Sequence, residues 1–119
     1  MSQFIDGNYR TFAAGAAIEQ HALVKLSSGK LAAAGLGEAF IGTLDQQSFA
    51  DLDVVRVRLR TAAGTHKVVA SGAFAAGALV YGRAAGRVDD ISTTSAVLVG
   101  TALEAATTAG DIVEVVPSF

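Results

Sequence analysis

The sequence of 119 residues contains no cysteine, no tryptophan and only one proline. Without cysteine the chain cannot form a disulfide, bind a metal through thiolates or use a cysteine nucleophile. Aromatic residues make up only 7% of the chain. We therefore expect a thin core of small side chains, of the kind that partner subunits often complete. The length is that of one domain of common size.

A strong charge imbalance and long apolar stretches are also lacking. The formal net charge is −2, so no overall positive field would attract nucleic acid, and we expect no nucleic-acid partner. The longest uncharged run, between Lys67 and Arg83, has about 15 residues, short of the roughly 20 that span a bilayer. Because Met1–Arg10 includes Asp6 and no apolar stretch, we expect neither a signal peptide nor a membrane partner.

Glycine is abundant, with 13 residues that mark frequent turns. Short runs rich in aliphatic and β-branched residues lie between these turns at intervals of about 10 residues. No long segment carries capped apolar periodicity of 3.6 residues. The pattern predicts an all-β fold, either a small β-sandwich or a barrel. The expected strands fall at Ala22–Leu26, Phe40–Leu44, Val54–Leu59, Lys67–Val69, Leu79–Tyr81, Val97–Val99 and Ile112–Val116.

An internal repeat organises these runs. Matching segments recur at offsets of about 56 to 58 residues, and the small drift in offset is what insertions in loops would produce. We therefore expect two related β-meander halves, about 17–59 and 73–117, within a single β domain of residues 15–119. Residues 1–14 precede the repeat as an N-terminal arm or an edge strand. The aligned segments are His21–Val24 with Gly77–Val80, Gly29–Leu31 with Gly86–Val88, Ile41–Thr43 with Val99–Thr101, and Asp53–Val57 with Asp111–Val115.

Sequence motifs of catalytic, metal-binding and phosphate-binding sites are missing. His21 and His66 have no second ligand at a metal-binding spacing, and no Gly-x-Ser-x-Gly elbow occurs. Gly35-Leu36-Gly37 lacks the third glycine and the following helix of a phosphate-binding loop. We expect no enzyme activity, no cofactor, and no catalytic, cofactor-binding or metal-binding residues.

One group of charged residues is regularly spaced. Arg56, Arg58 and Arg60 alternate with Val55, Val57 and Leu59, so one face of this strand is apolar and the other cationic. Binders of single-stranded nucleic acid place aromatic platforms beside such cations, and none is interleaved here. The stripe is either a solvated face or a face that pairs with acidic groups of a neighbouring subunit.

The order and spacing of several segments resemble those of the phage capsid cement, or head decoration, family. The likeness covers residues 15–117 and is strongest in the second half. Leu52-Asp53 departs from the Gly-Asp expected there, and Ala62–Lys67 has no counterpart. The segments that carry the likeness are Gly77–Tyr81, Ala85–Arg87, Val99–Ala106 and Thr108–Val115.

The resemblance implies a structural protein made in the host cytoplasm and located on the virion, at the outer capsid surface. Proteins of this family bind the outside of the assembled phage head, often as trimers, and stabilise contacts between major capsid subunits. The expected partners are therefore the phage major capsid protein and two further copies in a homotrimer.

The N-terminal segment holds three of the eight aromatic residues, and aromatic side chains are enriched at binding hot spots. As an arm, it would place Phe4, Tyr9, Arg10 and Phe12 on capsid protein or a neighbouring cement subunit, and the face of Arg56, Arg58 and Arg60 would add further contacts. The alternative function is a carbohydrate- or ligand-binding β module on a virion or cell surface. Such modules usually present exposed tryptophan or tyrosine platforms, and this chain has no tryptophan.

Overall fold

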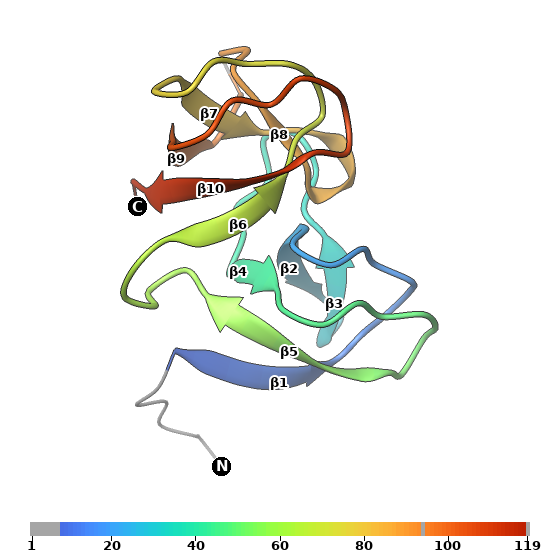
Figure 1. Cartoon of the computed structure of the whole chain (residues 1–119). Coiled ribbons are helices and arrows are strands. Elements are labelled where there is room, and N and C mark those ends of the chain that lie inside the picture. Colours follow the sequence, from blue (N-terminus) through green and yellow to red (C-terminus); the bar gives the residue numbers. More distant parts are fainter. Residues whose placement is uncertain (1–7, 94, 119) are drawn as a thin grey trace.

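The computed structural model describes residues 8–93 and 95–118. In this part of the chain, strands account for nearly all the regular structure, and they form two antiparallel five-stranded sheets (Figure 1). The all-β prediction is confirmed. No helix within the described residues is long and apolar enough to cross a membrane.

The first half of the chain, residues 9–59, builds the lower sheet of Figure 1, with the strand order β1-β5-β4-β2-β3. Ala14, just after β1, forms a parallel bridge with Leu31 of β3. This bridge joins the two edges of the sheet and curls it towards a half-barrel. The strands are β1 (Tyr9–Ala13), β2 (Leu23–Ser27), β3 (Lys30–Ala33), β4 (Gly42–Leu44) and β5 (Val54–Leu59).

The second half, residues 66–117, builds the upper sheet with the order β6-β10-β9-β7-β8. This is the order of the first sheet with each strand number raised by five. Ala70 and Val88 form the matching parallel bridge. The elements are β6 (His66–Val69), β7 (Leu79–Gly82), the 3-10 turn η1 (Ala84–Gly86), β8 (Val88–Asp89), β9 (Leu98–Ala102) and β10 (Ile112–Pro117).

Matching side-chain hydrogen bonds join the loops of the two halves to their strands. Asp53 Oδ2 accepts from the backbone N–H groups of Phe49 and Ala50 at 2.7 and 3.1 Å. Asp111 Oδ2, 58 positions later, accepts from those of Thr107 and Thr108 at 2.8 and 3.2 Å. Each sheet also contains one strand, β1 or β6, that lies before the repeat units expected from the sequence.

Most of the buried apolar side chains form two clusters. The first consists of residues of the first half, including Val24, Leu31, Val55 and Val57. The second combines residues of the second half with three from the first, namely Leu23, Ala34 and Phe40. Since successive residues of a strand point to opposite faces, β2 places Val24 in the first cluster and Leu23 in the second. The two halves are therefore held together because apolar side chains of both are buried in the second cluster.

Two glycines hold neighbouring strands at close approach. A Cβ added to Gly42 would lie under 3.0 Å from the carbonyl oxygen of Arg58 in the adjacent strand β5, and one added to Gly100 would meet Val116 of β10 in the same way. Backbone atoms of a paired strand cannot move aside without breaking the ladder. These positions therefore require glycine for steric reasons.

We predict that Gly42→Ala and Gly100→Ala each destabilise the fold by at least about 2 kcal/mol, because the added methyl group forces two paired strands apart. Gly72→Ala is the matched control, since a Cβ there meets nothing within 4 Å, and it should change stability by no more than about 0.5 kcal/mol. Urea unfolding of the three variants checks this. Equal midpoints for all three would contradict the close approach.

Candidate functional site

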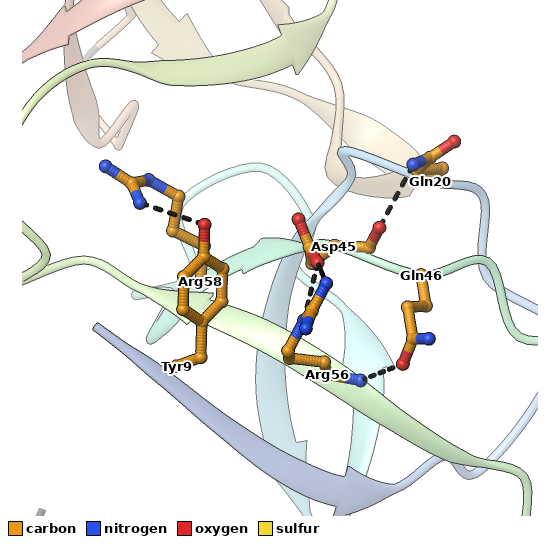
Figure 2. A network of polar contacts seen from close by, with 6 residues as sticks. All are labelled: Tyr9, Gln20, Asp45, Gln46, Arg56 and Arg58. Atoms are coloured by element: carbon orange, nitrogen blue, oxygen red, sulfur yellow. Dashed lines mark hydrogen bonds and ion pairs between the residues drawn. The ribbon is translucent and has the colours of Figure 1, made fainter. Parts of the chain in front are cut away.

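The alternation in β5 and its pairing with β1 bring together three of the residues expected to make contacts. Val55 and Val57 are buried in the first cluster, while Arg56 and Arg58 point the other way. In the β1–β5 ladder Tyr9 lies opposite Arg58, so its side chain shares their face, as cross-strand neighbours do. We call Tyr9, Asp45, Arg56 and Arg58 the arginine surface (Figure 2).

Contacts with Tyr9 hold both guanidinium groups of this surface. Arg58 Nη1 donates a hydrogen bond to the Tyr9 hydroxyl at 3.2 Å, and Arg58 Nη2 donates to the Ala63 carbonyl oxygen at 2.5 Å. The guanidinium carbons of Arg56 and Arg58 lie 5.0 and 5.6 Å from the centre of the Tyr9 ring, within cation–π range. The two cations are thus presented in fixed orientations.

Asp45 makes the surface mixed in charge. Arg56 Nε donates to Asp45 Oδ2 at 2.7 Å, and Arg56 Nη2 lies 2.5 Å from the same oxygen. Gln46 accepts from the backbone N–H of Arg56, and Gln20 donates to the Asp45 carbonyl oxygen. Figure 2 shows the contacts that link Gln46, Arg56, Asp45 and Gln20, beside the hydrogen bond of Arg58 to Tyr9. Because the Arg56 side chain is half exposed, its ion pair adds little stability, and Arg56 remains able to contact an outside carboxylate.

The other residues expected to make contacts lie elsewhere. The Arg10 guanidinium sits over the Phe12 ring at 4.9 Å, and half-buried Phe12 packs on the first cluster. The Arg60 guanidinium sits over Phe40 at 4.9 Å, and its Nη1 donates to the Phe40 carbonyl oxygen at 3.3 Å. Arg60 therefore lies at the junction of the two halves. Phe4 lies outside the described residues.

A cleft beside the arginine surface was not expected from the sequence, because both halves of the chain contribute to it. Its volume is about 290 Å³, and each lining residue has a polar or charged group in its side chain. Strand pairing places Tyr9 and Thr43 beside Arg58 in the first sheet and Lys67 opposite Glu114 in the second, and no sequence motif marks these positions. The lining residues are Tyr9, His21, Thr43, Asp45, Arg58, Thr65, Lys67 and Glu114. Within the described residues, no group of three or more His, Cys, Asp or Glu side chains is placed to hold a metal ion.

His66 lies buried behind this cleft. Its Nδ1 is 3.3 Å from the hydroxyl of Thr43, across the junction between the halves. Burial penalises the charged imidazolium and, with the nearby Arg58 guanidinium, lowers the pKa of His66 from 6.5 to about 4. His66 is therefore neutral at neutral pH.

Comparison with known proteins assigns the chain to a family. A family model described as phage cement protein matches residues 5–117, which is almost the whole chain and includes both sheets. A comparison with curated proteins gave no match.

The buried imidazole predicts a specific pH dependence of stability. The unfolded chain binds a proton at His66 near pH 6.5, whereas the folded chain binds it only near pH 4. Stability should therefore be lost as the pH falls from about 6.5 to about 4, by about 2 kcal/mol. Urea unfolding at pH 7.5 and 4.5 measures the loss. His66→Gln should remove most of it, even though His21, whose pKa is also lowered by burial, still contributes. Equal losses in the two proteins would contradict the assignment.

Proposed function

The chain belongs to the phage cement protein family, and on this premise we propose that it binds the outer surface of the assembled phage head and stabilises contacts between major capsid subunits. The family is a structural one that acts at the phage capsid. The observation that carries the proposal is the match over residues 5–117. The proposal includes a homotrimer as the attached form, with synthesis in the host cytoplasm.

The mode of action that we propose is adhesion in many copies. Each cement protein meets a repeating lattice, so several modest contacts act together and give a much higher effective affinity than one contact alone. Such a protein needs rigid, complementary surfaces, whereas a deep pocket is not required. The two sheets meet this need, because apolar side chains of both halves are buried in one cluster.

We propose the arginine surface as one contact with capsid protein. Arginine and tyrosine are enriched at protein interfaces, and a side chain held in place before binding loses less entropy on association. Tyr9 and Ala63 already orient Arg58, and Asp45 orients Arg56. Acidic groups of a capsid subunit would complement this surface.

The N-terminal segment is proposed as a second contact. β1 is an edge strand of the first sheet, and Tyr9 and Arg10 on it are exposed. An edge strand is a ready site for a neighbouring chain. A partner that approaches this edge would meet both residues, and Phe4 is proposed to extend the same contact.

Carbohydrate binding, the alternative function, draws less support. The aromatic ring nearest the cleft is that of Tyr9, and two guanidinium groups lie over it. A sugar needs a free aromatic face for stacking.

We predict that Arg56→Glu weakens binding to purified heads that lack the cement protein by at least about tenfold, about 1.4 kcal/mol, because it reverses a charge on the proposed contact. Glu104→Lys is the control, because it reverses an exposed charge beside the second sheet, away from the arginine surface. Co-sedimentation with the heads measures affinity, and melting curves check the fold.

Glu104→Lys should bind like the original chain, and both variants should melt within a few degrees of it. Equal binding by Arg56→Glu and Glu104→Lys would show that the arginine surface does not contact capsid protein. Absence of binding by the unchanged chain would contradict the proposed function itself.

A further inference from the structure

At three equivalent positions the apolar residue is buried in the first half and exposed in the second. Leu23, Ala34 and Phe40 of the first half are 1%, 2% and 3% exposed. At the matching positions the second half has Leu79, Ile91 and Leu98, which are 49%, 52% and 36% exposed. The match follows the ladders: Leu23 pairs with Thr43 and Leu79 with Thr101, 58 positions later. We call Leu79, Ile91 and Leu98 the exposed trio.

The first-half residues are buried because the second half covers them. The backbone N–H of Gly86 in η1 donates to the Ala34 carbonyl oxygen at 2.8 Å. A Cβ on Gly86 would lie 2.6 Å from the Leu23 carbonyl oxygen, so the η1 turn rests directly on Leu23. His66 reaches Thr43 in the same contact. Leu23, Ala34 and Phe40 thus form an inserting face on the first half. The second-half residues that cover them, including His66 and Gly86, form a receiving face.

The first half carries its own copy of the receiving face, and the residues of that copy are more exposed. His66 is buried, whereas Arg10 at the matching place in β1 is exposed. Val68 and Val99 are buried, whereas their counterparts Phe12 and Ile41 are half-buried. Gly86 is buried against Leu23, whereas Gly29, in the matching turn, is exposed, and a Cβ there would meet nothing within 4 Å.

We infer that the exposed trio inserts into the first-half receiving face of a second copy of this chain, so that copies join head to tail by repeating the junction already made within each chain. The face that inserts and the face that receives differ, so the contact is heterologous, and such contacts give closed rings or open filaments. The inference deepens the proposed homotrimer, on which it rests, by naming the surfaces through which the three copies meet.

The contact between copies is a looser version of the internal one. Leu26, exposed, stands where the second half has Gly82, against which Leu23 packs, so the two receiving faces differ in shape at this position. The internal junction is also strengthened by the ion pair of Arg87 with Glu19 at 2.9 Å. The matching positions hold Lys30 and Ala75, which cannot form such a pair. A weaker contact suits copies that associate on the head.

Cysteine pairs test this arrangement, since the chain has no cysteine of its own. Arg10 and Thr101 match His66 and Thr43, whose side chains touch at 3.3 Å. The Arg10→Cys/Thr101→Cys variant, oxidised or treated with a short bismaleimide, should give covalent multimers on a non-reducing gel. Each single variant alone should give none, whereas a mixture of the two should give dimers. Crosslinking of one single variant with itself would indicate a two-fold contact and overturn the inference.

Substitutions within the exposed trio give a second readout. Leu79→Thr/Leu98→Thr should reduce the mass measured by light scattering to that of a monomer, or remove crosslinks between copies on heads, while the melting curve stays normal. Phe49→Thr/Val54→Thr is the control, because both residues are highly exposed apolar residues outside the trio, and it should keep the multimer.

The two proposals fail differently. Crosslinks from the trio to capsid protein in place of a second copy would overturn the inference and leave head attachment standing. Multimers that do not bind heads would leave the inference standing and contradict the proposed function. A chain that is monomeric in solution and gives no crosslinks between copies on heads would overturn the inference.

Discussion

The structure depends on one constraint: the second half of the chain completes its core only with side chains of the first half. A unit of about 50 residues buries too little apolar surface to be stable alone. The second half solves this by taking Leu23, Ala34 and Phe40 of the first half into its cluster. β2 is thus buried on both faces, with Val24 in one cluster and Leu23 in the other. The two sheets form one body because they share these side chains.

The same constraint determines which surfaces remain for partners. The outer face of β5 is not needed for either cluster, so it carries Arg56 and Arg58, which Tyr9 and Asp45 hold in place. The junction between the halves uses one inserting face and one receiving face, which leaves one of each on the surface. A structural protein with a charged face and two apolar faces fits a family that works by attachment.

Much of this organisation was predictable from local patterns. The alternation of Val55 and Val57 with arginines predicted β5, and the order of segments in the second half indicated the family. Contacts that depend on register were not predictable: Tyr9 meets Arg58, 49 positions away, only because β1 pairs with β5. Nor could the sequence show that Leu23 is buried and Leu79 exposed, because the two residues occupy equivalent strands and have similar neighbours. Their exposure differs because the second half covers only one of them.

The most direct test of the account is an electron density map of decorated phage heads at a resolution that separates strands. The account predicts copies in contact with one another, with the exposed trio of each against β1 and the β2–β3 turn of the next, and with the arginine surface facing capsid protein. Single copies separated by bare capsid, each with Leu79 and Leu98 in solvent, would contradict it.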